Sequence, residues 1–278
     1  MKQLYDDNAF DCSRITAKNY STSFSFGIGL FKKKYRPAIY AIYGFVRFAD
    51  EIVDTFNNID QKAALEKLKK DTTEAIRNGF SSNPVLHSFQ KTVREYQINE
   101  DYIAAFLKSM EMDLTKKQYS EPEIKEYIYG SAEVVGLMCL KVFYKGHPQK
   151  FNELIYPARK LGEAFQKINF LRDIRSDYLE NGRCYFPGID FENFTDEQKE
   201  KIETDISGDF RKASEGISKL HSEVRLGIYL AYSYYLQLLK KIRKTSPEQL
   251  LNQRYRVSNL MKIFILIKVW ISCRLGII

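Results

Sequence analysis

Residues 166–187 read QKINFLRDIRSDYLENGRCYFP, which opens as a stretch of helical pattern that carries two aspartates four positions apart among apolar residues. A shorter segment, RFADEIVD at residues 47–54, repeats this arrangement. On a helix, residues four apart lie one turn apart on the same face. Carboxylates at this spacing repel each other by about 0.2–0.5 kcal/mol when exposed, and by more when buried. Two such stripes in apolar helices indicate that the chain binds divalent cations.

Each stripe contains further polar side chains. A helix turns by about 100° per residue, so the polar side chains fall within an arc of about 60° in one segment and about 80° in the other. Unpaired carboxylates are costly in a dry core, so these faces cannot simply be buried. The members are Tyr43, Arg47, Asp50 and Asp54 in the first stripe, and Gln166, Asn169, Asp173 and Asp177 in the second.

The carboxylates and the amide offer oxygen donors, which suit Mg²⁺ better than zinc, with Mn²⁺ as an alternative. Magnesium keeps water ligands and shares its coordination shell with substrate phosphates. We therefore expect a Mg²⁺-bridged diphosphate between the two helices, with phenylalanine and tyrosine side chains around an apolar tail. The structural alternative is a salt-bridge network in which the aspartates pair with Arg47, Arg172 and Arg175.

The composition favours a helical protein. Hydrophobic residues make up 44% of the 278 residues, and only 14 glycines and 7 prolines are present, which disfavours an all-β fold. Nearly every segment has helical periodicity and no linker interrupts the chain, so we expect one all-α domain spanning residues 1–278. Asp60 is the expected N-cap of one helix, and Gly79 its C-terminal stop. The expected helices are 37–56, 60–78, 84–96, 99–117, 121–144, 149–180, 195–222, 224–244 and 258–272.

The segment 182–195, GRCYFPGIDFENFT, is the longest expected non-helical stretch. It directly follows the second acidic stripe, and long loops beside polar sites often act as lids. We expect it to close over a diphosphate with Arg183, Tyr185 and Phe186. A static connector is the alternative.

The charge and cysteine content narrow the classes of partner. A net charge of +8 suits a nucleic acid, a membrane surface or anionic phosphates. No RNA- or DNA-binding motif is present, so nucleic acid is not the expected partner. The four cysteines are scattered without zinc spacing and indicate a reducing compartment, so we expect a cytoplasmic protein. The sequence does not indicate an oligomeric state.

Residues 260–278 read LMKIFILIKVWISCRLGII, an apolar run interrupted by Lys262, Lys268 and Arg274. No uninterrupted stretch approaches the roughly 18–20 residues of a membrane-spanning helix. One interpretation is a last helix that packs on the body of the protein. The other is an interfacial helix that contacts anionic lipid, which would make the protein peripheral on the inner face of the membrane.

The chain resembles the squalene/phytoene synthase family of head-to-head prenyl synthases over nearly its full length. That family's second motif, QxxNxxRDxxxDxxxGRxYxP, matches residues 166–187, with four residues instead of three between Asp177 and Gly182. Its first, YxxCRxxDDxVD, matches YGFVRFADEIVD at residues 43–54, where Val46 and Glu51 depart from the pattern. A central YxYxxAxxVG segment matches YIYGSAEVVG, with Glu133 where family members often have glycine. An upstream SxSF segment matches Ser21, Ser23 and Phe24, and the segments YYLQLLKKI and RYRVS resemble the family's last helices.

The resemblance implies an all-α isoprenoid-synthase fold, a single-domain helical bundle around a central cavity. It also implies a Mg²⁺ cluster, catalysis by the motif aspartates with Arg47 and Tyr129, and contacts to the substrate from both segments. The implied metal ligands are Asp50, Asp54, Asn169, Asp173 and Asp177. The implied substrate-binding residues are Ser21, Ser23, Phe24, Tyr43, Arg47, Gln166, Arg172, Arg183 and Tyr235.

Family members join two prenyl diphosphates by way of a cyclopropylcarbinyl diphosphate, which then rearranges to a linear hydrocarbon. We expect two geranylgeranyl diphosphates to be joined to phytoene for carotenoid synthesis. The alternative within the family is a squalene or dehydrosqualene synthase that uses farnesyl diphosphate. No NADPH-binding fingerprint is evident, so NADPH is not expected. From another class, a non-catalytic relative acting as an assembly factor is disfavoured because both aspartate motifs are retained.

Overall fold

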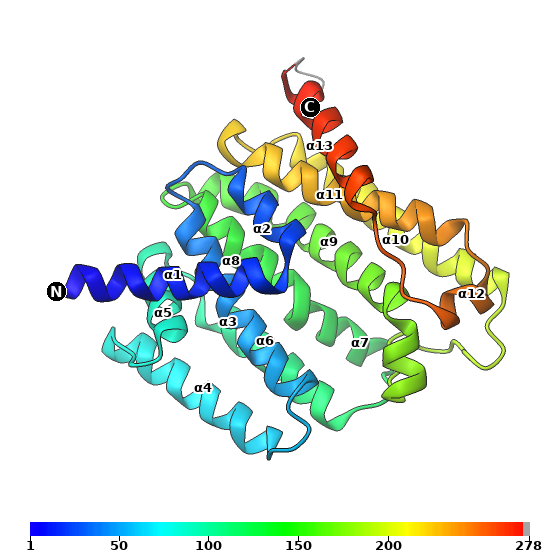
Figure 1. Ribbon diagram of the computed structural model, residues 1–278, viewed down its shortest axis with the longest axis horizontal. Coiled ribbons are helices and arrows are strands. Elements are labelled where there is room, and N and C mark those ends of the chain that lie inside the picture. Colours follow the sequence, from blue (N-terminus) through cyan, green and yellow to red (C-terminus); the bar gives the residue numbers. More distant parts are fainter. Residues whose placement is uncertain (275–278) are drawn as a thin grey trace. The chain divides into compact units, whose positions relative to one another are not determined.

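The computed structural model describes residues 1–274, which form thirteen α-helices and two π-helical segments. Those residues contain no β-strand, only a single bridge between Gln118 and Cys184. The all-α prediction is therefore confirmed. The α-helices are α1 (Lys2–Tyr20), α2 (Thr22–Gly29), α3 (Arg36–Asp54), α4 (Gln61–Asn78), α5 (Pro84–Tyr96), α6 (Glu100–Thr115), α7 (Glu121–Ile128), α8 (Val134–Phe143), α9 (Pro148–Arg172), α10 (Asp196–Ile217), α11 (Ser222–Arg243), α12 (Pro247–Asn252) and α13 (Asn259–Arg274), and the π-helical segments are η1 (Tyr129–Glu133) and η2 (Arg175–Glu180) (Figure 1).

The chain divides into two compact units. Unit 1 comprises residues 1–115 and 134–155, and unit 2 comprises residues 116–133 and the chain from residue 156 onward. That the whole chain forms one domain stays a prediction. None of the helices described in either unit combines the length and hydrophobicity that crossing a bilayer requires.

Local signals in the sequence set several helix ends as predicted. The side chain of Asp60 accepts a hydrogen bond from the Ala63 amide at 2.9 Å and caps α4. Gly79 ends the same helix with φ = 71°, a left-handed conformation that glycine adopts without steric cost. Three helices were not expected, namely α1, α2 and α12. The buried face of α1 consists of small or polar residues, Asp6, Ala9, Ser13 and Ala17, so it lacks a strong apolar stripe.

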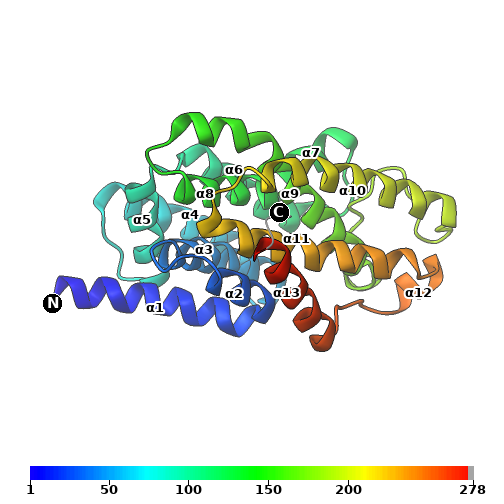
Figure 2. The same cartoon turned by 90° about the horizontal axis from the view of Figure 1, so that it is seen from above.

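Unit 1 is built around α3, which packs against α1, α5, α6 and α8 (Figures 1 and 2). The fully buried Phe45 of α3 stacks on Phe89 of α5 with ring centroids 3.9 Å apart. Gly44 allows α1 to approach, because a Cβ there would lie 2.9 Å from Ser13 Oγ. At about 100° per residue, Phe45 lies opposite the acidic stripe on α3. Core packing therefore leaves the stripe on the other face of that helix.

A buried polar cluster ties α1 to α5 in the same unit. The Asp6 carboxylate accepts a hydrogen bond from Lys91 Nζ at 2.5 Å and lies 2.8 Å from His87 Nε2. Asp6 is 6% exposed. Hydrogen bonds from Lys91 and then from His87 hold the pKa of Asp6 below its ordinary value of 3.8.

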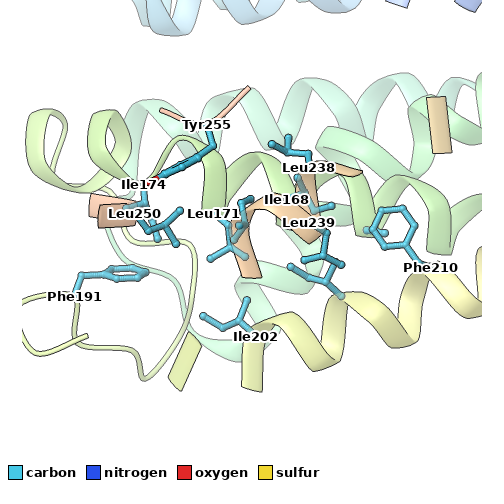
Figure 3. Close-up of a cluster of buried hydrophobic side chains, with 13 residues drawn as sticks. Ile168, Leu171, Ile174, Phe191, Ile202, Phe210, Leu238, Leu239, Leu250 and Tyr255 are labelled. Atoms are coloured by element: carbon cyan, nitrogen blue, oxygen red, sulfur yellow. The ribbon is translucent and has the colours of Figure 1, made fainter. Parts of the chain in front are cut away.

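Unit 2 has a core formed by three long helices, with α10 running alongside α11 (Figure 2). Figure 3 shows side chains from α9, α10 and α11 meeting in this core. The non-helical segment 182–195 takes part, because Phe191 is 3% exposed and belongs to the same cluster. The other members are Ala164, Ile168, Leu171, Ile174, Ile202, Ile206, Phe210, Leu238, Leu239, Ile242, Leu250 and Tyr255.

The predictions of continuous helices over 121–144 and 149–180 were wrong in detail. The first is interrupted by η1, and the second bends at Asp173 before η2. At η1, Gly162 of α9 packs closely against the backbone of the π-turn. A Cβ on Gly162 would lie 2.8 Å from the Ala132 carbonyl oxygen. Short π-helical segments occur frequently at functional sites, and both of these lie in the motifs identified from the sequence.

Asp6→Asn should lower the free energy of unfolding by about 1–3 kcal/mol near neutral pH, because it removes charge-assisted hydrogen bonds. The pKa of Asp6 is lower in the folded than in the unfolded state, so its contribution is complete above the unfolded value. It is lost as the pH falls through the folded one. Thermal unfolding of both proteins near pH 7 and near pH 3 should therefore show a smaller difference in acid. The exposed Asp7→Asn is the control, and equal losses for both variants would contradict the prediction.

Gly162→Ala should destabilise the protein by about 1–3 kcal/mol, since the added methyl group meets backbone atoms that cannot rotate away. Gly208→Ala in α10 is the matched control, because no atom lies within 4 Å of its added Cβ. That substitution should stabilise the helix by about 0.5–1 kcal/mol. Denaturant unfolding measures both values, and a neutral Gly162→Ala would show that the π-turn does not need this contact.

Candidate active site

The first acidic stripe lies on the last two turns of α3, where an arginine pairs with one of its aspartates. Arg47 Nη1 donates to Asp50 Oδ2 at 2.6 Å, and the same guanidinium pairs with Glu51. The guanidinium carbon also lies 4.4 Å from the ring centroid of Tyr20, at the end of α1. Asp54 is the exposed last residue of the helix. The salt-bridge alternative is thus realised for Arg47.

One hydrogen-bond donor of Arg47 is unused. Its Nε atom is buried and has no hydrogen-bond partner within the described part of the chain. An unsatisfied buried donor on a guanidinium is costly, and an anionic oxygen is the partner that it binds most strongly. This atom therefore indicates a place for an anionic ligand beside Asp50.

The upstream residues form an aromatic pair next to α3. Ser21 is the N-cap of α2, and its hydroxyl oxygen accepts a hydrogen bond from the Phe24 amide at 3.2 Å. The ring of Phe24 stacks on that of Tyr43, with centroids 5.2 Å apart. Ser23 is half-buried in the same helix. The structure thus brings Phe24 to the acidic helix through Tyr43 and assigns Ser21 a capping role.

The second acidic stripe keeps its spacing across the bend in α9. The Asp173 amide donates to the Asn169 carbonyl, and the Asp177 amide to the Asp173 carbonyl, each at 2.9 Å. Each bond is an α-helical turn, so the three residues succeed one another at one-turn intervals although Asp177 lies in η2. The predicted one-turn spacing of Asn169, Asp173 and Asp177 is confirmed.

Two arginines pair with Asp173. Arg172 Nε donates to Asp173 Oδ1 at 3.0 Å, and Arg254 Nε lies 2.6 Å from the same oxygen. Burial disfavours the charge on Arg172, but its hydrogen bonds to Asp173 and the nearby negative charge together outweigh this and raise the pKa of the guanidinium. Arg175 does not join this pair, because it bonds to the Asn252 carbonyl and to Glu180. The salt-bridge alternative was right for Arg172 and wrong for Arg175.

Arg254 was missed as a site residue from the sequence alone. It lies between α12 and α13, far along the chain from Asp173, so no helical spacing relates the two. The only signal was its place at the start of RYRVS, one of the segments that resemble the family.

The amide of Asn169 is held by its neighbours. The Tyr235 hydroxyl of α11 donates to Asn169 Oδ1 at 3.2 Å, and Asn169 Nδ2 donates to Gln166 Oε1 at 3.5 Å. Tyr235 is itself fixed by Phe165, whose ring stacks on it at a centroid distance of 3.9 Å. The structure therefore brings Gln166, Asn169 and Tyr235 together beside Asp173, and their roles toward metal and substrate stay predictions.

Tyr129 opens η1 and is covered by an arginine from α9. The guanidinium carbon of Arg159 lies 5.1 Å from the Tyr129 ring centroid, and Arg159 Nε donates to the Glu133 carboxylate. Burial raises the pKa of Glu133, against the lowering effect of the Arg159 hydrogen bond. Glu133, one of the departures from the family pattern, thus anchors the cation that covers Tyr129.

The segment after η2 is anchored to the body of unit 2. The Arg183 amide donates to the Asp177 carbonyl at 2.6 Å, and the Cys184 amide to the Lys117 carbonyl at 2.7 Å. Tyr185 is 7% exposed and stacks on Phe170 with centroids 4.2 Å apart. These contacts agree with a static connector around Tyr185. A lid movement stays a prediction.

Within residues 1–274, no three carboxylate, histidine or cysteine side chains are grouped closely enough to hold a metal ion by themselves. Magnesium is commonly bound through one or two carboxylates, with water and substrate phosphates completing its shell. The donors present in both stripes are carboxylate and amide oxygens, and this set fits such an ion.

A family model for squalene/phytoene synthases matches residues 17–261. The chain belongs to the squalene/phytoene synthase family. As a member of this family it is an enzyme, a prenyltransferase of the type that condenses prenyl diphosphates head to head. The predicted family and enzyme class are thereby confirmed.

Several relatives align over most of the chain. A phytoene synthase from Arthrospira platensis is 28% identical over 282 residues, covering 92% of this chain and 90% of the relative. A 4,4'-diapophytoene synthase from Staphylococcus haemolyticus (strain JCSC1435) is 26% identical over 257 residues, covering 86% and 88%. The solved structure of a dehydrosqualene synthase in complex with a ligand has a TM-score of 0.85 at 23% identity, covering 98% of both chains. This likeness confirms the isoprenoid-synthase fold.

Asp173→Asn should lower stability in buffer containing a metal chelator, by about 1–3 kcal/mol, because the buried guanidinium of Arg172 loses its counter-ion. Repulsion along the stripe alone would have the opposite effect. Glu180→Gln is the control, since its pair with Arg175 is 3.7 Å long and exposed, and it should change stability by less than about 0.5 kcal/mol. An Asp173→Asn variant that melts above the wild type would show that repulsion dominates.

Proposed function

We propose that the enzyme condenses two molecules of geranylgeranyl diphosphate to phytoene, with Mg²⁺ as cofactor, in carotenoid biosynthesis. The observation that carries this proposal is the similarity to the Arthrospira platensis phytoene synthase along nearly the whole of both chains. Plant phytoene synthases support it, among them one from Zea mays at 28% identity over 86% of this chain. NADPH is not part of the proposal.

In this proposal, Mg²⁺ is held by Asp50 and Asp54 on α3 and by Asn169, Asp173 and Asp177 on the second stripe. The oxygen-only donor set supports this assignment. Asn169 Oδ1 accepts one hydrogen bond from Tyr235 and keeps a second lone pair for a cation. When bound, the metal would supply electrostatic stabilisation of the negative charge that develops on the departing diphosphate.

The arginines of the two stripes would bind the diphosphates. Arg47 has a free buried Nε donor, and Arg172 and Arg254 are already placed against Asp173. Arginine presents several N–H donors to phosphate oxygens in a fixed geometry, so these side chains can hold the leaving group as it gains charge. Gln166 would add a neutral amide donor, and Arg183 another cation.

Aromatic side chains would surround the apolar substrate chains and stabilise the carbocation that forms. Phe24 and Tyr43 form one stacked pair, and Phe165 and Tyr235 form another. The faces of such rings attract positive charge, and apolar walls exclude water that would quench a carbocation. Tyr129 is engaged by Arg159, so its contribution would be a hydroxyl held in a fixed position. The expected central cavity stays a prediction.

Farnesyl diphosphate is the competing substrate. The diapophytoene synthase relative and the dehydrosqualene synthase structure both support this second candidate. A C20 substrate needs a longer apolar channel than a C15 substrate, but Gly29 lines a cavity of about 520 Å³ whose walls include Arg14, Lys18 and Lys33. That cavity is basic, so it does not provide an apolar channel at Gly29.

The substrate is tested by incubating the purified enzyme with Mg²⁺ and either geranylgeranyl or farnesyl diphosphate, followed by mass identification of the hydrocarbon. We expect phytoene, with kcat/KM at least about tenfold higher for geranylgeranyl diphosphate, since a C5 difference changes apolar binding substantially. A dominant C30 product would replace the proposal with the second candidate. No product from either substrate would favour the non-catalytic alternative.

Asp50→Asn, Asp54→Asn and Asp177→Asn should each lower kcat/KM by about two to three orders of magnitude, as removal of a group that stabilises transition-state charge commonly does. Asp71→Asn on the exposed face of α4 is the control and should retain activity. Mg²⁺ with an unreactive thio-diphosphate analogue should raise the melting temperature of the wild type and of the control more than that of the motif variants. Near-normal turnover in the motif variants would contradict the metal assignment.

A further inference from the structure

Helix α13 packs with one face and exposes the other. It lies against α11, where Tyr234 donates to the Lys262 carbonyl at 3.1 Å, and it buries only Ile265 and Val269 (Figures 1 and 2). On the opposite side, large apolar residues follow one another at helical spacing within an arc of about 120°. We call these residues the apolar face; they are Leu260, Ile263, Phe264, Ile267, Trp270 and Ile271, and each is 45–82% exposed.

A basic cavity of about 650 Å³ adjoins the start of α13. Its lining includes Met261 in the first turn of that helix. It also includes the cations at the carboxyl-terminal end of α11. Lys240, Lys241, Arg243, Lys244 and Arg256 supply five positive charges. A concentrated positive charge thus borders an exposed apolar helix.

Few carboxylates neutralise this cavity. Arg243 Nε lies 3.9 Å from Glu203, and Lys241 Nζ donates to the neutral carbonyl of Arg256 at 3.0 Å. Among residues 1–274, Lys240, Lys244 and Arg256 form no ion pair with a carboxylate. No acidic residue follows Glu248 in the sequence, while five basic ones do. The positive charge of the cavity is therefore available to bind an external anion.

Stabilisation of the α11 carboxyl terminus explains only part of this arrangement. Cations in the last turn of a helix offset its negative end, which accounts for Lys240, Lys241 and Arg243. Arg256 does not belong to that helix, and helix capping needs no exposed apolar neighbour. An anion that carries its own apolar part fits both features at once.

We propose that the basic cavity binds the phosphate headgroup of an anionic phospholipid, while the apolar face of α13 lies in the interfacial layer of the same membrane. Basic side chains near a membrane attract anionic lipid, and amphipathic helices bury their apolar residues at the headgroup boundary. Lys268 and Arg274 place further positive charge beside the apolar face. The guanidinium carbon of Arg274 lies 5.0 Å from the ring centroid of Trp270. The interaction does not depend on which prenyl diphosphate the enzyme uses.

Trp270 makes the interaction directly observable, because it is the single tryptophan of the chain and lies in the apolar face. The full-length protein is titrated with vesicles of phosphatidylcholine alone, and with vesicles containing phosphatidylglycerol in a 7:3 mixture, without prenyl diphosphate. We expect blue-shifted Trp270 emission and co-sedimentation with the phosphatidylglycerol vesicles, both weakened by added salt. A wild type that shows neither effect would overturn the proposal.

The cavity is tested by the triple substitution Lys240→Gln, Lys244→Gln and Arg256→Gln, which should weaken binding to phosphatidylglycerol vesicles by at least about tenfold. The control triple, Lys62→Gln, Lys67→Gln and Lys70→Gln on the exposed side of α4, removes the same net charge and should bind nearly as wild type. Equal losses in both triples would reduce the effect to overall charge and overturn the cavity assignment.

A second pair of measurements separates lipid from soluble phosphate. Phe264→Ser with Ile267→Ser should weaken vesicle binding, while melting curves show that the exposed positions leave the fold intact. Inorganic diphosphate, titrated by calorimetry, should not compete with the vesicles beyond its ionic-strength effect. If diphosphate binds the wild type but not the cavity triple, and vesicles are ignored, the cavity serves a soluble anion and the membrane proposal fails.

Discussion

Carboxylates one turn apart on a helix repel each other, and in both acidic stripes of this chain arginines pair with an aspartate. On α3, Arg47 bonds to Asp50 and Glu51, and directly after α9, Asp173 pairs with Arg172 and Arg254. In low dielectric surroundings, a carboxylate without such a partner would shed its charge by taking up a proton. The arginines therefore offset the charge of these carboxylates in the absence of any ligand. The same cations can turn to a diphosphate when one binds, which makes the paired state compatible with the proposed chemistry.

The features that the sequence predicted well are local. Asp60 and Gly79 act on backbone groups within one turn, so residue type alone determines the ends of α4. The one-turn spacing of Asn169, Asp173 and Asp177 also follows from neighbouring positions, and consecutive hydrogen bonds preserve it through the bend. The motif at residues 166–187 also predicted the family correctly, because its pattern is long and specific.

The features that the sequence did not predict depend on distant contacts or on weak patterns. Helix α1 packs through Asp6 and Ser13, whose partners His87, Lys91 and Ser88 lie on α5. Periodicity cannot reveal a buried face made of polar and small side chains. Arg254 meets Asp173 only because the segment before α13 returns to α9. The π-turn at η1 lies against Gly162 of α9, a distant contact, and its period is close to that of an α-helix, so the sequence pattern does not reveal it.

The two π-helical segments have a consequence for how this chain can change in length during evolution. A π-turn holds one more residue than the α-turn that it replaces, so deleting one residue there restores α-geometry without disturbing the flanking helix. Elsewhere in a helix, a single deletion rotates every later side chain by about 100° and turns core residues toward solvent. Residues 129–133 and 175–180 are therefore places where homologous chains can gain or lose a residue while α8 and the core of unit 2 keep their register.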